Sequence, residues 1–346
     1  AKLSGEGGTA GEITYHSSNQ TYLTVEVNTG ILTPVAVGGS SEITAIMAGT
    51  GTVKSEHITK TIYVKRSSTA TAVAQADKIY NGVSQIGVTG NHVTWTGITE
   101  ATDVGTYIAI ATPEENYAFE DGSTDAKTIT WKINAKEVAV IWEDVTSFVY
   151  NGKPQAPSAT AESGVDGEIL NIVRTTGINV GTYTSTASIS SVSGGRGKAS
   201  NYTLTGNTKQ FTIARAKTAT ASSTNKTYNG ATQTGVTGSQ VTWSGTQSAI
   251  DAGTYTAKAT PTSNYAWSDG TTGAKTITWT MNKKSVAVTW GSTTFTYNGK
   301  AQGPTASATS GVSGETIKVT RTTETNVGTY TSTARISSVS GGRGKA

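Results

Sequence analysis

One short stretch of the chain has residue types suited to binding phosphate. The segment Ser193–Ala199, SGGRGKA, contains the glycines and the lysine of a phosphate-binding loop. That loop also needs a glycine five positions before the glycine that precedes the lysine, and a serine or threonine directly after the lysine. These two positions hold Val192 and Ala199. We therefore interpret the segment as a glycine-rich hairpin loop with solvated basic side chains.

A second stretch has the oxygen ligands of a calcium loop. FEDGSTDA, Phe119–Ala126, places acidic and hydroxyl side chains at nearly alternate positions, which suits that ion. The equivalent stretch later in the chain is WSDGTTGA, residues 267–274, and it lacks counterparts of Glu120 and Asp125. An obligatory cation site would keep its ligands in both copies. The sequence therefore predicts a turn here and no metal.

Catalytic residue types are otherwise sparse. The three histidines, His16, His57 and His92, are far apart in the sequence, and His92 is replaced by Gln240 in the second copy of its repeat. The chain has no cysteine, so disulfides and thiolate metal sites are excluded. We expect no catalytic residue and no cofactor, and therefore a protein that is not an enzyme.

Two aromatic residues are the candidates for ligand binding. Phe119 in NYAFEDG and Trp267 in NYAWSDG occupy equivalent places beside a turn. A ring exposed there could stack on a sugar or contact a partner. Alternation with Tyr117 and Tyr265 favours the other interpretation, in which both rings of each pair face the core.

The composition predicts strands joined by tight turns. The chain of 346 residues has 40 glycines, many threonines, serines and valines, and only 14% charged residues, which argues for an all-β fold. Its net charge of +4 comes from scattered lysines and arginines, so we interpret it as solubilising and expect no nucleic-acid partner. No run of about 18 apolar residues is present, so we expect no direct membrane insertion.

A long repeat organises most of the chain. Tyr80-Asn81-Gly82 recurs 148 residues later, and Tyr-Asn-Gly also begins at Tyr150 and Tyr297. The block therefore comprises two related units of about 70 to 80 residues each, in the order A, B, A, B. We define repeats A1 (67–135), B1 (136–215), A2 (216–283) and B2 (284–346, truncated before its Asn-Tyr motif). Residues 1–66 do not match the repeat.

Alternation of apolar and polar residues predicts which side chains face inward. In KTITWKI, for example, Trp131 shares a face with two isoleucines. Each Asn-Gly suits a turn with positive φ, and the tyrosine before it can pack its ring. The predicted core and turn residues are Tyr80, Gly82, Trp95, Tyr107, Trp131, Trp142, Tyr150, Gly152, Tyr183, Tyr228, Trp243, Tyr255, Trp279, Trp290, Tyr297 and Tyr330.

The connections between repeats are short and almost free of glycine, as in WKINAKEVAV and FTIARAKTATA. Two or three polar residues leave little room for hinge motion. We therefore predict an elongated string of small β-modules. At about 3.3 Å per residue, strands of about ten residues make modules roughly 30 to 40 Å long, so five in line reach on the order of 150 to 200 Å.

The first 66 residues form a separate predicted domain. Its residues Val27–Ala45 run through an Asn-Thr-Gly-Ile turn, a Val-Gly-Gly segment and an Ile-Thr-Ala strand. This order resembles the group 2 bacterial immunoglobulin-like domains. The resemblance implies an immunoglobulin-type sandwich, or a piece of one.

The A and B repeats resemble the MBG (mostly β-grasp) repeats of large bacterial surface and secreted proteins. In B1 the resemblance rests on Tyr150–Lys153 with Gln155 and Pro157, on Asn179–Tyr183, on Asn201–Thr203 and on Phe211–Ile213. It implies small β-grasp-like modules, an extracellular setting at a bacterial cell surface, and a role as stalk or spacer in an adhesin-like chain. It brings no catalytic residues.

The function expected from the sequence is a non-catalytic stalk whose partners are neighbouring modules of the same longer chain. One alternative is a multivalent carbohydrate-binding array, in which weak contacts of each copy with glycans or host surfaces combine into avidity. Another is a phage fibre or virion-attached protein built from the same modules.

Overall fold

A computed structural model describes residues 11–51 and 54–342, and within them the chain is all-β apart from one 3₁₀ turn, η1 (Ala199–Asn201). The predicted fold class is confirmed. The chain divides into two compact units. Unit 1 comprises Ala1–Ile141, Ala159–Val173 and Ala187–Asn207, and unit 2 comprises Trp142–Ser158, Arg174–Thr186 and Thr208–Ala346. In the described residues no helix is long and apolar enough to cross a bilayer.

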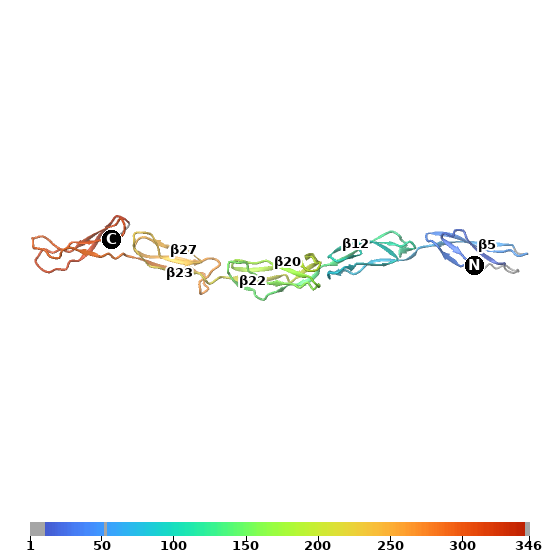
Figure 1. Cartoon of the computed structure of the whole chain (residues 1–346), viewed down its shortest axis with the longest axis horizontal. Coiled ribbons are helices and arrows are strands. Elements are labelled where there is room, and N and C mark those ends of the chain that lie inside the picture. The colour runs from blue at the N-terminus through green and yellow to red at the C-terminus, as the bar shows by residue number, and fades with distance from the viewer. Residues whose placement is uncertain (1–10, 52–53, 343–346) are drawn as a thin grey trace. The chain divides into compact units, whose positions relative to one another are not determined.

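The N-terminal region of unit 1 has an antiparallel sheet and a hairpin (Figure 1, dark blue). The sheet has the order β1-β4-β5, with β1 at Ile13–Ser17, β4 at Gly39–Met47 and β5 at Glu56–Val64. The hairpin pairs β2 (Leu23–Val25) with β3 (Leu32–Pro34). Leu23 of β2 and Met47 of β4 are buried, and Met47 shares its face of β4 with the buried Ser41.

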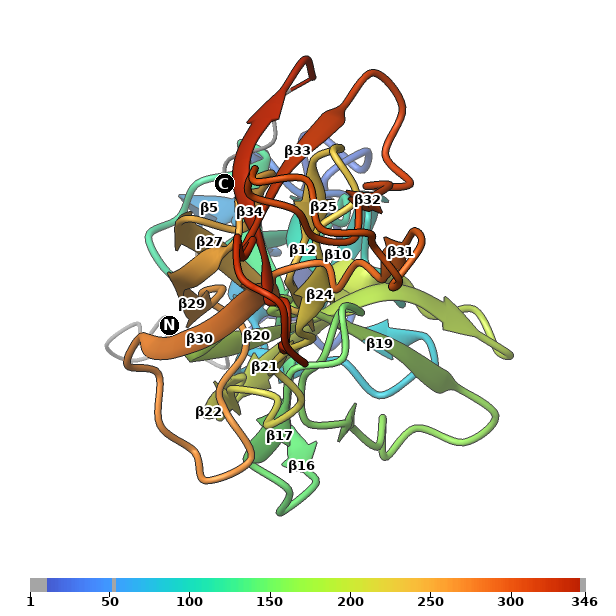
Figure 2. The same cartoon turned by 90° about the vertical axis from the view of Figure 1, so that its left-hand side faces the viewer.

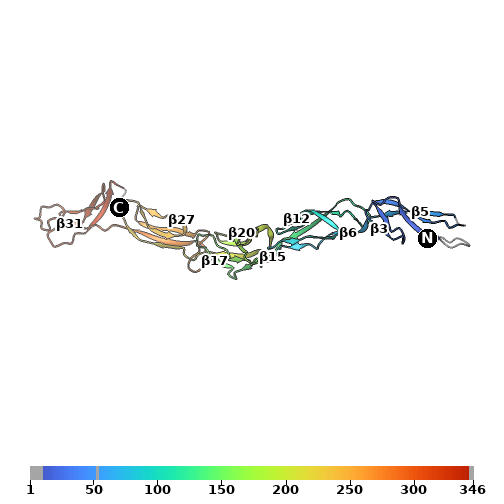
Figure 3. The same cartoon turned by 45° about the vertical axis from the view of Figure 1, so that its right-hand side comes forward.

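Repeat A1 has a four-stranded sheet of order β10-β12-β14-β7 (Figure 3). Its longest strands pair antiparallel, so that Tyr107 lies opposite Trp131, and the indole NH of Trp131 donates to the carbonyl of Ile98 at 2.8 Å. A smaller sheet has the order β13-β6-β9. The strands are β6 (Ser67–Ala74), β7 (Lys78–Ile79), β8 (Gln85–Ile86), β9 (Val88–Asn91), β10 (Val93–Gly97), β11 (Glu100–Ala101), β12 (Gly105–Pro113), β13 (Tyr117–Phe119) and β14 (Lys127–Asn134).

Repeat A2, in unit 2, has the matching four-stranded sheet, of order β24-β30-β29-β27. Tyr255 lies opposite Trp279, as Tyr107 lies opposite Trp131 in A1. Its strands are β23 (Thr220–Ser223), β24 (Lys226–Thr227), β25 (Gln233–Thr234), β26 (Val236–Ser239), β27 (Val241–Gly245), β28 (Ser248–Ala249), β29 (Gly253–Pro261) and β30 (Lys275–Asn282). The repeat seen in the sequence is thus a repeat of structure.

Repeat B1 supplies strands to both units. Figure 3 labels three of its strands, β15, β17 and β20. In unit 1, β15 runs parallel to β21. In unit 2, β22 pairs with β17 and with residues 181–186 of β20. The strands are β15 (Lys136–Ala139), β16 (Ile141–Trp142), β17 (Ser147–Val149), β18 (Ala159–Thr160), β19 (Ile169–Arg174), β20 (Gly181–Ser193), β21 (Tyr202–Thr205) and β22 (Thr208–Ala214).

Repeat B2 keeps only part of this framework (Figure 2). It consists of two pairs, β31 (Val288–Trp290) with β32 (Ala306–Ala308) and β33 (Thr316–Arg321) with β34 (Ala334–Ser340). Among its described residues the counterparts of β15, β17 and the first half of β20 are not strands. Each of these strands pairs with β21 or β22 in B1, and B2 contains no copy of those sequences.

Three residues that the sequence analysis placed in the core are exposed in the structure. Trp290, Tyr297 and Tyr330 are exposed, at 39%, 61% and 51% respectively. In B1, Phe211 of β22 lies beneath the counterparts of the two tyrosines, stacked on Tyr183 at 5.4 Å and in one cluster with Tyr150. The described residues of B2 include none in the place of Phe211, so Tyr297 and Tyr330 face solvent.

Candidate functional site at the junctions between repeats

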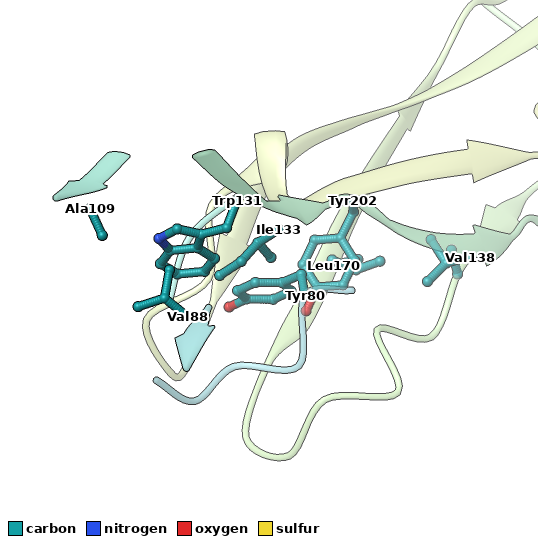
Figure 4. Close-up of a cluster of buried hydrophobic side chains, with 9 residues drawn as sticks. Tyr80, Val88, Ala109, Trp131, Ile133, Val138, Leu170 and Tyr202 are labelled. Atoms are coloured by element: carbon teal, nitrogen blue, oxygen red, sulfur yellow. The ribbon is translucent and has the colours of Figure 1, made fainter. Parts of the chain in front are cut away.

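The largest buried cluster of unit 1 joins A1 to B1 (Figure 4). Tyr80 follows β7 and is 1% exposed, and its ring packs edge-on against Tyr202 at the start of β21, with the centroids 5.4 Å apart. Ile133 of A1 and Leu170 of B1 belong to the same cluster. The tyrosine of Tyr-Asn-Gly therefore packs against the next repeat as well as its own.

A carboxylate from B1 lies at the centre of this contact. The hydroxyl of Tyr80 donates to Glu168 Oε1 at 2.7 Å, and the hydroxyl of Tyr202 donates to Glu168 Oε2 at 2.5 Å. Glu168 is 7% exposed, and no cation forms an ion pair with it in the described residues. Two phenol donors thus take the place of the water that a carboxylate needs when it is buried.

Glycines allow the surrounding loops to approach this carboxylate. A Cβ added at Gly195 would lie 2.6 Å from Glu168 Cγ, and one at Gly197 would lie 1.9 Å from Oε2. On the A1 side, Gly82 has a φ of 83°, and an added Cβ would lie 2.5 Å from the side chain of Val165. The segment that resembled a phosphate loop is therefore wrapped around a carboxylate of its own repeat.

A second set of contacts centres on Asn201, which is 1% exposed. Its side-chain carbonyl accepts the backbone NH of Val104 at 3.0 Å, and its amide donates to Asp103 Oδ1 at 2.9 Å. Lys198 pairs with Asp103 Oδ2 at 2.6 Å. The 3₁₀ turn η1 places Lys198 and Asn201 together, so one short segment of B1 binds both oxygens of the A1 carboxylate.

These contacts shift the pKa values of the groups involved. Burial, followed by the hydrogen bond to Glu168, raises the pKa of Tyr80 to about 12. The same two causes raise the pKa of Tyr202. The hydrogen bond from Lys198, with that from Asn201, lowers the pKa of Asp103 below its ordinary value. The folded state therefore favours neutral tyrosines and an ionised aspartate at this junction.

One local motif positions the A1 side of the contact. The hydroxyl of Tyr107 donates to the carbonyl of Asp103, four residues earlier, at 2.6 Å. Tyr183 makes the same bond to Asn179 in B1 at 2.8 Å, and Tyr255 makes it to Asp251 in A2 at 2.7 Å. The tyrosine of each Gly-Thr-Tyr motif thus holds the preceding turn, Asp-Val, Asn-Val or Asp-Ala, in place.

The B1–A2 junction, within unit 2, uses the same positions with different chemistry. Asn264 accepts the backbone NH of Val180 at 3.0 Å and donates to Asn179 Oδ1 at 3.0 Å. Tyr150 packs edge-on against Tyr265 at 5.3 Å. The Asn-Tyr motif of one repeat therefore engages the Tyr-Asn-Gly and Gly-Thr-Tyr motifs of the repeat before it.

The A2–B2 junction, also within unit 2, is only partly made. Tyr228 donates to Glu315 Oε1, as Tyr80 does to Glu168. An added Cβ at Gly230 would lie 2.5 Å from Val312, which reproduces the approach of Gly82 to Val165. A cavity of about 530 Å³ lies beside Tyr228 and Glu315.

The two candidate ligand-binding rings lie in cores. Phe119 and Trp267 are each 3% exposed. Lys127 lies 4.1 Å above the Phe119 ring and Lys275 lies 4.9 Å above the Trp267 ring. The Trp267 indole NH also donates to the carbonyl of Gly273 at 2.7 Å. Rings covered in this way offer no open face on which a sugar could stack.

The acidic stretch beside Phe119 forms a turn held by its own side chains. Asp121 accepts the backbone NH of Ser123 at 2.9 Å and pairs with Lys127 at 3.0 Å. Asp269 does the same with Thr271 and Lys275 in A2, and the hydrogen bonds from Thr271 lower its pKa to about 2. In the described part of the chain no group of three His, Cys, Asp or Glu residues is placed to hold a metal.

No protein-family model matches this chain, and a search of curated proteins finds no match. Similar solved structures include invasin, titled a bacterial integrin-binding protein, at 12% identity over 83% of this chain and 75% of that one, with a TM-score of 0.29. Immunoglobulin domains 1–5 of Sidekick-1 match at 10% identity over 80% and 74%, with a TM-score of 0.24. Drosophila N-cadherin EC1-4 matches at 9% over 82% and 94%, with a TM-score of 0.18. These scores are too low to support an inference about function.

The sequence did not single out Glu168, Asp103 or Asn201 as a site. One signal was present, because the Gly-Glu pair at Glu168 recurs at Glu315, 147 residues later, next to a glycine-rich loop that also recurs. A solvated carboxylate in a loop has no structural role that would require it in both copies. A buried acceptor at a junction explains the repetition.

Proposed function

We propose that this protein is a non-catalytic stalk or spacer, in which hydrogen bonds between consecutive repeats suppress motion at the junctions. The observation that carries the proposal is Glu168 of B1, held between Tyr80 of A1 and Tyr202 of B1. A buried acceptor satisfied by donors from two modules is expensive to expose, because bending the junction leaves polar groups unpaired. Junctions of this kind keep the distance between consecutive repeats constant.

The wider setting is part of the same proposal. The repeats are MBG-type modules that follow a bacterial immunoglobulin-like domain, and the chain is part of an extracellular adhesin-like protein at a bacterial surface. The support is the sequence resemblance, together with two contacts that each occur at two junctions. A backbone NH of one repeat donates to an asparagine of the next at A1–B1 and B1–A2. A tyrosine of one repeat donates to a glutamate of the next at A1–B1 and A2–B2. Recurrence of the same contacts from one junction to another suits a protein whose role is to provide length.

The test measures distances between spin labels in A1 and B1. The chain lacks cysteine, so labels at Thr96→Cys and Val173→Cys, both exposed, are site-specific. We expect a narrow distance distribution in the parent chain and a broad one after Glu168→Ala. Glu315→Ala is the matched control and should leave the A1–B1 distribution narrow. A broad distribution in the parent chain would refute the proposal.

A further inference from the structure

The A1 and A2 repeats have the same sheet and opposite net charge. A1 contains eight acidic residues and three lysines, a net charge of −5, whereas A2 contains two acidic residues and five lysines, a net charge of +3. Six acids of A1 are replaced by neutral residues in A2. All six are exposed, and in the described structure none forms an ion pair with a lysine or arginine. They are Asp77, Glu100, Glu114, Glu115, Glu120 and Asp125.

The outer face of the A1 sheet is also more apolar than that of A2. The backbone NH of Ile98 donates to the carbonyl of Ile108 at 2.8 Å, and Ile110 follows on the same side of β12. Ile86 lies opposite Glu100, two residues beyond Ile98. These four isoleucines, which we call the A1 face, are 36% to 58% exposed. The equivalent A2 face is Thr234, Thr246, Thr256 and Lys258.

Charge selects the partner that fits the A1 face. Exposed aliphatic side chains that lie together mark an interaction surface. Two A1 repeats would repel each other, as would two A2 repeats, whereas A1 and A2 attract. Lys258 is exposed on a central strand of the A2 sheet. Its aliphatic stem can cover isoleucines while its ammonium group reaches a carboxylate such as Glu100.

We propose that this chain associates with a second copy of itself, the A1 face of one copy binding the A2 face of the other. The isoleucines pack on the threonine methyl groups and on the stem of Lys258. Ion pairs between the A1 acids and the A2 lysines select this pairing over A1 with A1. The inference goes beyond the proposed stalk function and does not depend on it.

The size of the face sets the expected strength. Three strands of the length of β12, nine residues, cover roughly 400 Å² per partner at about 3.3 Å per residue and about 4.8 Å between strands. This area belongs to the weak class of interfaces. We therefore expect association at chain concentrations on the order of 0.1 mM.

Sedimentation of the whole chain at two salt concentrations tests the proposal. At about 0.01 M salt the average mass should rise with chain concentration. At about 1 M salt the association should weaken at least about tenfold, because the Debye length falls from about 30 Å to about 3 Å. A chain that stays monomeric up to about 1 mM at low salt would refute the proposal, and so would association that salt leaves unchanged.

Two triple variants each remove one of the two surfaces. The first installs the A2 residues at three A1 acids: Asp77→Asn, Glu100→Ser and Glu114→Thr. The second neutralises three A2 lysines that have no counterpart in A1: Lys217→Ser, Lys258→Thr and Lys283→Ala. Each variant alone should associate at least about tenfold more weakly than the parent chain. An equimolar mixture should associate more tightly than either variant alone, because the first keeps the A2 face and the second keeps the A1 face.

The matched control neutralises three exposed acids of B1: Asp144→Asn, Glu162→Gln and Asp166→Asn. It should associate as the parent chain does. Ile108→Thr, which installs the A2 residue, should weaken association severalfold and keep its salt dependence. The proposal fails if the control loses as much association as the A1 variant, if mixing restores nothing, or if Ile108→Thr has no effect.

Discussion

The A1–B1 and A2–B2 junctions have nearly the same sequence and differ in how completely they are buried. At A1–B1, Tyr80 is 1% exposed and Glu168 is 7% exposed, and the acid accepts two phenol donors. At A2–B2, Tyr228 and Glu315 are only half-buried, and the acid accepts one such donor. At A1–B1, Tyr202 supplies the second phenol donor and Asn201 binds Asp103 and Val104.

At A1–B1 a single residue takes part in three of the junction contacts. Tyr202 packs edge-on against Tyr80, donates a hydrogen bond to the second oxygen of Glu168 and is the first residue of β21, which pairs with β15. In the described residues of B2, Glu315 is half-buried and residues 284–287 form no strand. Burial strengthens each hydrogen bond and raises the penalty for leaving it unmade.

The largest expected difference between the junctions comes from removing the acid. Glu168→Ala should lower local stability by about 3 kcal/mol, because it leaves two buried phenols unpaired. Glu315→Ala should lower it by about 1 kcal/mol, because its single donor is half-exposed and can bond to water. Hydrogen exchange at residues 78–82 and at residues 226–230 measures the two effects separately. Equal losses would show that burial does not set the strength of the junction.

Replacing the junction asparagines should have a smaller effect. Asn201→Ala removes an acceptor for Val104 and a donor to Asp103, and it should cost about 2 kcal/mol because Asn201 is buried. Asn264→Ala removes the equivalent bonds at B1–A2, where the side chain is half-buried, and should cost about 1 kcal/mol.

The check is hydrogen exchange of the Val104 and Val180 amides. Asn201→Asp serves as a control, since it keeps the acceptor and replaces the donor with a charge beside Asp103. If neither alanine variant changes the protection of these amides, the Asn-Tyr motif does not hold one repeat against the preceding one.

Alkaline pH should produce the smallest difference in stability between the A1–B1 and A2–B2 junctions. The pKa of Tyr80 is raised from 10.0 to about 12, so the stability it contributes is present below pH 10 and is lost as the pH rises towards 12. The loss at pH 10.5 is about 1 kcal/mol for one such tyrosine. A1–B1 has two buried tyrosines with raised pKa values, whereas at A2–B2 the pKa of Tyr228 alone is raised, also to about 12.

Thermal unfolding at pH 8 and pH 10.5 tests this order. Glu168→Gln should shrink the alkaline loss, because it removes the charge that opposes tyrosine ionisation. Glu315→Gln should shrink it less. An alkaline loss that is identical in the parent chain and in Glu168→Gln would mean that other groups cause it.

The sequence predicted the parts of the fold that depend on local patterns. Period-two alternation placed Trp131 and Trp279 inward, and both are buried, at 2% and 0%. The Asn-Gly turns were also expected, and Gly82 and Gly152 have positive φ. Such features need only the residues within one strand or turn.

The junctions could not be predicted because their partners are distant in the chain. Tyr80 bonds to Glu168, 88 residues later, and Val104 bonds to Asn201, 97 residues later. Periodicity identifies a buried face but does not say which module covers it. The same limit explains Tyr297 and Tyr330, which have the pattern of core residues but lack the strand that would cover them.

The alternation of junction chemistry restricts the order in which repeats can follow one another. A-type ends present a tyrosine to a carboxylate that only B repeats carry, and B-type ends meet an A repeat through paired asparagines. Loss of a B unit would place two A repeats next to each other. The tyrosine hydroxyl at the end of the first would then have no carboxylate acceptor. We therefore expect changes in length that keep the joints tight to occur in whole AB pairs. The two nearly identical glycine-rich stretches, Val180–Ala199 and Val327–Ala346, are one such pair apart.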